Sequence, residues 1–175
     1  TELIKSAGLV GVSDRDGSIY DYFRDRLIFP IEDPRGQVIG FGARALGEIK
    51  PKYLNSPESP SFVKKSVLYG WSRARKAARR GLPVIVVEGY MDVIAVSSSG
   101  VAAAVAPLGT ALGEDQFRLL WKLSNDPVLC FDGDKAGQIA AQRAIERVLP
   151  LLEPGRSVRL AVLPKGQDPD DILPV

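Results

Sequence analysis

The second half of the chain alternates short apolar segments with stretches of helical spacing, and this pattern constrains the fold more than any other feature. Four segments rich in Val, Ile, Leu and Ala are too short for helices, namely 83–87, 101–106, 128–131 and 159–163. The longest stretch of helical spacing runs over 136–152. Short segments that are apolar on both faces and alternate with helices are typical of buried parallel strands with right-handed crossovers. We therefore predict an α/β domain with a parallel sheet of about four strands.

The first part of the chain has a different pattern and predicts a smaller, mixed α+β subdomain. Two β-prone segments, 27–31 and 37–46, flank a turn that contains Pro34 and Gly36. This arrangement predicts a β-hairpin. Residues 47–66 are rich in Pro, Ser, Lys and Asn, and we interpret them as an irregular connection.

Charge is distributed unevenly between the two parts. Residues 1–80 hold fifteen Lys and Arg against nine Asp and Glu, whereas residues 81–175 hold eight against twelve. A short basic helix is expected over 71–80, ended by Gly81. One interpretation is a basic face for a polyanion beside an acidic site for cations; the other is that the helices have ordinary solvated faces. We predict two domains, 1–80 and 81–175.

The composition excludes several classes of site. The chain has no histidine and one cysteine, Cys130. Histidine-based triads and zinc sites built from Cys and His are therefore excluded within it. No segment reaches the roughly 18 apolar residues that a membrane-spanning helix needs, and the first residues do not resemble a signal peptide. Carboxylates, lysines, arginines and hydroxyls remain to carry chemistry.

Carboxylates follow three of the four predicted strands at the point where each strand ends. Glu88 follows the first strand, Asp132 and Asp134 follow the third, and Asp168 and Asp170 follow the fourth after a short loop. Because the carboxyl ends of parallel strands meet at one edge of a sheet, we expect these side chains to converge there. Carboxylates held close together repel each other and need a cation. Oxygen ligands without His or Cys suit Mg²⁺ or Mn²⁺.

Each carboxylate taken alone has a simpler interpretation. Glu88 could cap a helix or lie in a solvated loop, Asp132 and Asp134 could form a turn, and Asp168 could cap a helix. Asp92, four residues after Glu88, either faces the same edge or stabilises the start of its helix through the helix dipole. The coincidence of three acidic loops at one edge favours a metal site that orients phosphates and an oxygen nucleophile.

Several motifs resemble a known family. The sequences VEGYMDV at 87–93, FDGDKAG at 131–137 and DPDD at 168–171 resemble the TOPRIM domain of topoisomerases and primases. Four further motifs look like the catalytic core of bacterial replicative DNA primases of the DnaG type. They are RDRLIFPI at 24–31, GQVIGFGARAL at 36–46, PKYLNSPES at 51–59 and FVKKSVLYG at 62–70. The match follows the family's order through nearly the whole chain.

The resemblance implies an RNA polymerase that starts primers on single-stranded DNA from ribonucleoside triphosphates. It implies Mg²⁺ or Mn²⁺ held by the catalytic residues Glu88, Asp132 and Asp134. Asp168 and Asp170 are expected to support a further metal, and no zinc site is expected within this chain. The basic part is expected to bind template and triphosphate. The residues implied there are Arg44, Lys52, Asn55 and Lys64, and Asp92 is a possible supporting residue of the acidic site.

The resemblance also implies a cellular setting. The product would be an RNA primer, and the place of action the bacterial cytoplasm at the nucleoid, without a membrane. A replicative helicase is the expected partner, through a domain that this chain lacks, so we interpret the chain as a piece of the catalytic core. The alternatives are another TOPRIM enzyme, such as a nuclease, a topoisomerase or a primase–helicase fragment, and a non-catalytic nucleic-acid-binding module.

Overall fold

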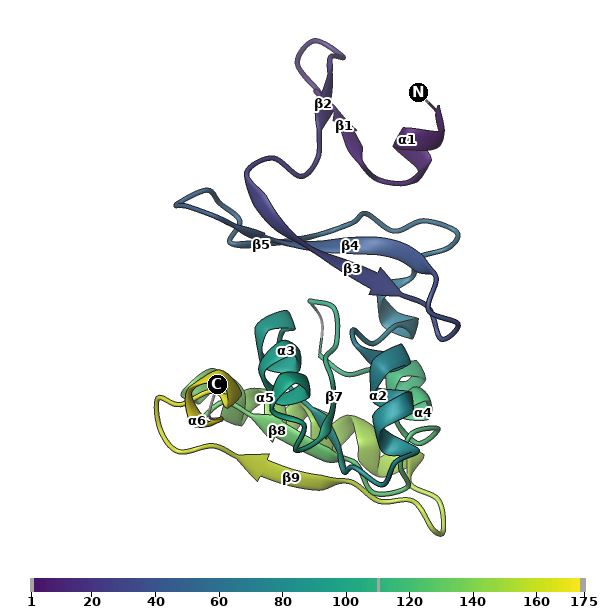
Figure 1. Ribbon diagram of the computed structural model, residues 1–175, viewed down its shortest axis with the longest axis vertical. Coiled ribbons are helices and arrows are strands. Elements are labelled where there is room, and N and C mark those ends of the chain that lie inside the picture. The colour runs from purple at the N-terminus through teal and green to yellow at the C-terminus, as the bar shows by residue number, and fades with distance from the viewer. Residues whose placement is uncertain (1, 110, 174–175) are drawn as a thin grey trace. The chain divides into compact units, whose positions relative to one another are not determined.

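A computed structural model describes residues 2–109 and 111–173, apart from the side chain of Asp170. The chain forms two compact units, Thr1–Val63 and Lys64–Val175. The predicted α/β class is confirmed, since the second unit contains a four-stranded parallel sheet and the first contains antiparallel strands (Figure 1). No helix within the described ranges is both long and apolar enough to span a lipid bilayer.

The first unit is built from antiparallel strands. Helix α1 (Glu2–Ser6) precedes a hairpin of β1 (Val10–Val12) and β2 (Ile19–Asp21). A three-stranded sheet follows, in the order β3 (Arg26–Glu32), β4 (Val38–Ala45) and β5 (Tyr53–Asn55). The buried hydrophobic residues of this unit are Phe29, Ile31, Ala43 and Phe62.

The predicted hairpin is confirmed as β3 and β4. Its turn is held by the Asp33 side chain, whose Oδ1 accepts hydrogen bonds from the main-chain N–H groups of Arg35 at 2.8 Å and Gln37 at 2.9 Å. The prediction that residues 47–66 are irregular was wrong at β5, which pairs with β4. Three residues between two proline-containing segments are too few for a periodic signal. Residues 53–55 form a strand because they pair with β4.

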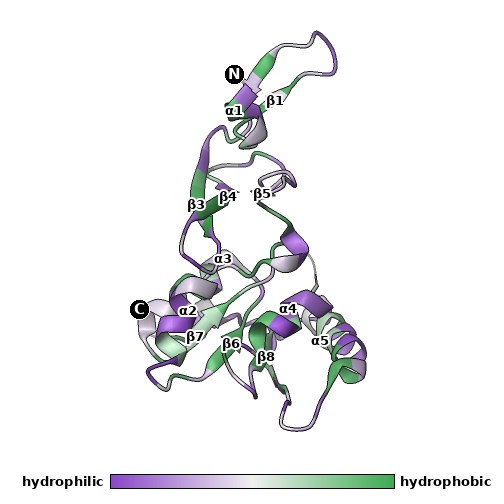
Figure 2. Ribbon diagram, turned by 90° about the vertical axis from the view of Figure 1, so that its right-hand side faces the viewer, coloured by the Kyte–Doolittle hydropathy of each residue, from purple (hydrophilic) through white to green (hydrophobic). Residues whose placement is uncertain are grey.

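The second unit is built around a parallel sheet in the order β7 (Ala103–Val105), β6 (Val84–Val86), β8 (Val128–Phe131) and β9 (Arg159–Val162). The helical segments follow in chain order. They are η1 (Lys64–Ser66), α2 (Trp71–Ala78), α3 (Tyr90–Ser99), α4 (Glu114–Leu120), α5 (Lys135–Val148), η2 (Leu149–Leu151) and α6 (Pro169–Ile172). One buried cluster joins α2, α4 and α5 to the strands. The central strands β6 and β8 are coloured as hydrophobic in Figure 2.

The strand β9 departs from the prediction of a strand buried on both faces. Among the described residues, it lies at the edge of the sheet and pairs only with β8. Leu160 is 44% exposed and Val162 is 52% exposed. The composition of a single strand reports its preference for extended structure, whereas its position in the sheet decides how much of it is buried.

Candidate metal centre and phosphate-binding residues

The structure brings Glu88 and Asp132 together at one edge of the parallel sheet. They come from neighbouring strands, because β6 and β8 pair in parallel with Val86 opposite Leu129. The main-chain N–H of Asp132 donates a hydrogen bond to Oε1 of Glu88 at 3.1 Å, although the residues are 44 positions apart. The two loops therefore meet where the sequence predicts, at the carboxyl ends of the strands.

The charge at this edge is poorly compensated around Asp132. The pKa of the Asp132 carboxyl rises from 3.8 to about 6, first because burial disfavours the charged form. Repulsion from Glu88, Asp92, Asp168 and Asp134 raises the pKa further, in that order. A carboxylate surrounded by others in this way gains much from a nearby cation.

The third acidic loop packs closely on the second through Gly133. A Cβ at this position would overlap the main-chain carbonyl groups of Leu163 and Pro164. The Gly133 N–H donates to the carbonyl oxygen of Gln167 at 3.4 Å. The two loops line a polar cleft of about 200 Å³, whose walls are Asp132, Gly133, Asp134, Gly166, Gln167 and Asp168.

Three of the predicted carboxylates also have local structural roles. Oδ1 of Asp134 accepts from the N–H of Gly137 at 2.7 Å and caps α5, and Oδ1 of Asp168 accepts from the N–H of Asp171 at 3.0 Å and caps α6. Oδ2 of Asp92 accepts from the N–H of Gly89 at 2.9 Å at the start of α3. The capping interpretation therefore holds for Asp168, whereas Asp134, interpreted from the sequence as part of a turn, also caps a helix. Asp92 lies at a helix start, as one of its two interpretations proposed. A capping carboxylate retains further lone pairs for a cation.

The donor set fits a hard divalent cation. Within the described residues, no three Asp, Glu, Cys or His side chains lie close enough to bind one ion as they stand. Binding therefore requires side chains such as Asp134 and Asp168 to turn toward Asp132 across the cleft. Carboxylate oxygens are the ligands that Mg²⁺ and Mn²⁺ prefer. The side chain of Asp170, predicted with this group, lies outside the described part of the chain.

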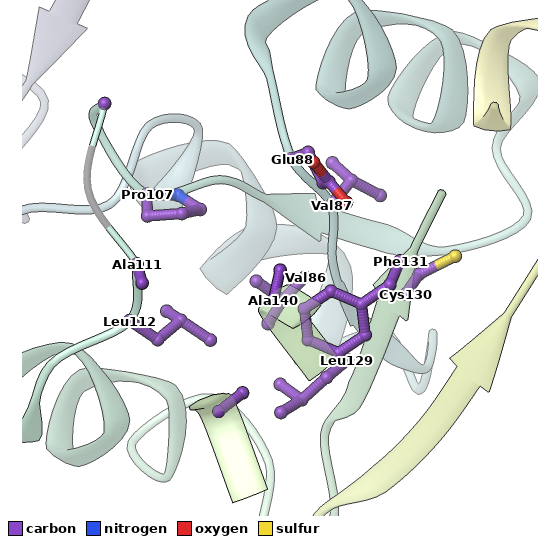
Figure 3. Close-up of a pocket in the computed structure, with 12 residues that line it drawn as sticks. Val86, Val87, Glu88, Pro107, Ala111, Leu112, Leu129, Cys130, Phe131 and Ala140 are labelled. Atoms are coloured by element: carbon purple, nitrogen blue, oxygen red, sulfur yellow. The ribbon is translucent and has the colours of Figure 1, made fainter. Parts of the chain in front are cut away.

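An apolar cavity of about 260 Å³ adjoins the acidic edge. Leu129 and Phe131 point into it, Glu88 lies at its rim, and the side chain of Cys130 points away (Figure 3). The Cys130 thiol is half-buried, and burial raises its pKa, as do the nearby charges of Asp132, Asp92 and Glu88. The cavity walls offer a hydrated cation few ligands, so the polar cleft is the better candidate for metal.

In the first unit, Arg44 and Asn55 share one face of the β3–β4–β5 sheet. Arg44 lies opposite Tyr53 and Asn55 lies opposite Gly42, so the two side chains are diagonal neighbours. The Nε of Arg44 is buried, with no hydrogen-bond acceptor among the described residues. Lys52 is exposed, with its Nζ 5.9 Å from the centre of the Tyr53 ring. This face offers cationic and amide donors to an anion.

Lys64 belongs to the second unit, where Gln116 fixes its main chain. The Gln116 side chain is 1% exposed. Its Nε2 donates to the carbonyl oxygens of Lys64 at 3.2 Å and Val67 at 3.0 Å, and its Oε1 accepts from the N–H of Gly113 at 3.0 Å. The sequence analysis missed this residue, and it also missed the cleft residue Gln167. A glutamine beside charged residues carries no signal of burial in a single sequence.

Comparisons with known proteins agree with this geometry. A model of the N-terminal domain of the DNA primase catalytic core matches residues 1–75, and a Toprim domain model matches residues 83–161. A DNA primase from Pseudomonas aeruginosa is 52% identical over 167 residues, which are 95% of this chain and 25% of the relative. The chain belongs to the DNA primase family. The resemblance to DnaG-type primases and the TOPRIM-type fold are thereby confirmed.

Solved primase structures match both units. A DNA primase domain from Pseudomonas aeruginosa is 50% identical with a TM-score of 0.93, over 98% of this chain and 53% of that one. A DnaG primase catalytic domain bound to single-stranded DNA is 46% identical with a TM-score of 0.88, over 98% of this chain and 53% of that one. The chain thus spans about a quarter of the curated relative and half of each solved chain.

The primase model over the first part separates this chain from other Toprim proteins. Topoisomerases and Toprim nucleases share the Toprim domain, but the match over residues 1–75 is to the primase core. The two models leave a gap between residues 75 and 83, and the compact units divide between residues 63 and 64. The domain boundary between residues 80 and 81 stays a prediction.

Proposed function

We propose that this chain is the part of a DNA primase that joins ribonucleotides into short RNA primers on single-stranded DNA. The observation that supports it most is the meeting of Glu88 and Asp132 at the edge of a Toprim sheet, where Asp134 and Asp168 line the adjoining cleft. Membership of the DNA primase family supports the reaction type.

In this proposal Glu88, Asp132 and Asp134 hold catalytic Mg²⁺ or Mn²⁺, and Asp168 with Asp170 support a further ion. Bound divalent ions would stabilise the charge that develops on the attacking 3′-oxygen and on the leaving pyrophosphate. The chain itself positions the ligands. The bond from Asp132 N–H to Glu88 fixes two of the loops, Gly133 lets the third loop approach, and Asp92 holds the turn after Glu88.

The basic residues bind the anionic reactants in this proposal. Arg44, Lys52 and Lys64, with Asn55, contact the template phosphates and the triphosphate. The solved relative bound to single-stranded DNA supports a DNA template as a ligand of such a core. Lys and Arg contacts to phosphates release counterions, so binding weakens steeply with salt. On the resemblance alone, we propose the bacterial nucleoid as the place of action and a replicative helicase as partner.

The test transfers these 175 residues into the primase of Pseudomonas aeruginosa in place of the matching segment. The chimera receives single-stranded template, ribonucleotides and Mg²⁺ or Mn²⁺. We expect short RNA from the unchanged chimera and a loss of synthesis by about a hundredfold or more with Asp132→Ala, since one charge-stabilising contact is worth this much. Template binding should remain, because Asp132 faces the metal and not the template.

Asp126→Ala serves as the matched control, since Asp126 pairs with Arg159 away from the edge, at 2.8 Å. Normal synthesis by the Asp132→Ala chimera would overturn the catalytic assignment. Loss of template binding together with synthesis would instead indicate a structural role. Template binding by an unchanged chimera that makes no RNA with either metal would favour the non-catalytic module.

A further inference from the structure

Helix α2 carries a line of cations that the proposed site does not use. Trp71 and Ala74 of this helix are buried against the core of the second unit. Arg73, Lys76 and Arg80 are exposed. Arg73 and Lys76, spaced at i and i+3, share one face of α2, and Arg80 follows in the turn after the helix; we call these three residues the basic ridge.

The charge of the ridge is not balanced within its own segment. Residues 71–80 contain five Arg and Lys and no Asp or Glu. Elsewhere in this unit, Arg118, Arg156 and Arg159 each pair with an acidic side chain. Across the described parts of the chain, no ion pair involves the three ridge residues. Arg75 differs from them, because it lies over the Trp71 ring at 5.2 Å.

Helix stability does not account for the ridge. The helix dipole favours cations in the last turn, which explains Lys76, and Arg80 follows the end of the helix. Arg73 lies in the first turn, where a cation is unfavourable and no acidic residue compensates. A residue that opposes the dipole at an exposed position points to an external anion.

The ridge begins at the same edge of the sheet as the acidic site. Tyr69, just before α2, exchanges main-chain hydrogen bonds of 2.8 and 3.2 Å with Ala106, just after β7. Ala106 lies at the carboxyl end of β7, which runs parallel to β6. The helix ends at Ala78, and residues 79–83 lead into the start of β6 at the opposite edge. The ridge therefore leads away from the carboxylates along one side of the unit.

We propose that the basic ridge binds the phosphate backbone of a single DNA strand that extends from the acidic edge. This proposal rests on the proposed function for the identity of the anion. One line of cations suits one strand, because a duplex presents two phosphate backbones. Trp71 is buried, and no other aromatic residue lies in α2, so the contact is to phosphate and independent of base sequence.

The experiment measures the affinity of the whole chain for labelled single-stranded DNA by fluorescence anisotropy across a series of salt concentrations. The double variant Arg73→Gln/Lys76→Gln is compared with Lys122→Gln/Arg143→Gln, which removes two exposed cations elsewhere in the same unit. We expect several-fold weaker binding at low salt for the ridge variant. The slope of log affinity against log salt should become shallower by about 1.4, because each phosphate contact to a single strand contributes about 0.7 and the variant removes two.

The control should keep the slope of the unchanged chain. Equal slopes for the ridge variant and the unchanged chain would overturn the proposal, as would an equal loss in the control. A loss confined to a duplex of the same sequence would overturn the single-strand assignment. Far-UV circular dichroism checks folding, and the single change Arg73→Glu, at an exposed position, supplies a second variant. Failure of Asp132→Ala to affect synthesis would remove the metal proposal and leave this binding result standing.

Discussion

The acidic edge of the second unit and the basic face of the first differ in how firmly the surrounding structure holds their side chains. The edge follows strands such as β8, whose Leu129 is fully buried, and main-chain hydrogen bonds tie its loops together. The β3–β4–β5 sheet buries few side chains, and Leu27 and Val38 are exposed on it. The difference matches the chemistry, because ligands of a divalent ion need fixed positions. Long cationic side chains can adjust their charged ends to a phosphate, so the backbone that carries them can be less rigid.

The two regions nevertheless share one property, which is an electrostatic cost in the free protein. At the edge, Asp132 is ionised against four other carboxylates. On the basic face, the Nε of Arg44 is buried without an acceptor among the described residues. Each region therefore lowers the stability of the free protein, and a ligand of opposite charge would remove this cost. Three substitutions test this comparison.

The largest effect is expected from Gly133→Ala at the edge. The added Cβ would overlap the Pro164 carbonyl, so one of the two acidic loops must move. We expect the free energy of unfolding to fall by about 1–3 kcal/mol. Stabilisation by Mg²⁺ should also be lost, because Asp132 and Asp168 separate. Denaturant unfolding with and without Mg²⁺ measures both effects.

Gly47→Ala is the control for that substitution, since a Cβ there meets nothing within 4 Å. Its change should stay within about 0.5 kcal/mol, as for most surface substitutions. Equal behaviour of the two variants would mean that the edge is no more rigid than the first unit.

A smaller effect of opposite sign is expected from Asp132→Asn. With chelator present, the variant should unfold at a higher temperature than the unchanged protein, because one repelling charge is removed. The folded-state pKa is raised from 3.8 to about 6, so the folded state holds its proton longer than the unfolded state. The stability of the unchanged metal-free protein therefore falls as pH rises through this range, and the variant should lack this fall. A melting temperature at or below that of the unchanged protein would contradict the repulsion.

The smallest effect is expected from Arg44→Met on the basic face. Methionine keeps much of the aliphatic volume and removes a buried donor that lacks an acceptor, so stability should stay equal or rise by about 1 kcal/mol. Triphosphate binding should weaken at the same time. Lys52→Met, at an exposed position, should weaken binding without changing stability. Thermal unfolding and equilibrium binding separate the two quantities, and a less stable Arg44→Met would show that the arginine is structural.

Much of the second unit could be predicted from the sequence because its signals are local. The segments that became β6 and β8 are apolar on both faces, and Glu88 and Asp132 follow them directly. The caps at Asp134 and Asp168 could not be separated from ligands, because a helix start and a metal loop use the same residues. The spacing of residues in the sequence predicts at which edge of the sheet a side chain lies. It does not predict the side-chain rotamer, which determines the contacts.

Other features were missed because they depend on distant partners. The strands β1, β2 and β5 have three residues each, which is too short for a periodic pattern. Gly133 resembles any turn glycine until Pro164 is placed beside it. The exposure of β9 follows from the absence of a second neighbour in the described sheet, and strand order is not written in the composition of a strand.

The contacts of Gln116 have a practical consequence for exchanging parts between primases. The Gln116 side-chain amide donates to the carbonyl groups of Lys64 and Val67, so a residue of α4 fixes the position of the Lys64 main chain. Lys64 therefore depends on the second unit for its position. In a hybrid joined after residue 80, Lys64 and Gln116 would come from different primases. Gln116 would then have to bond the main chain of the other primase. A junction between residues 63 and 64 keeps the lysine and its anchor on the same parental piece.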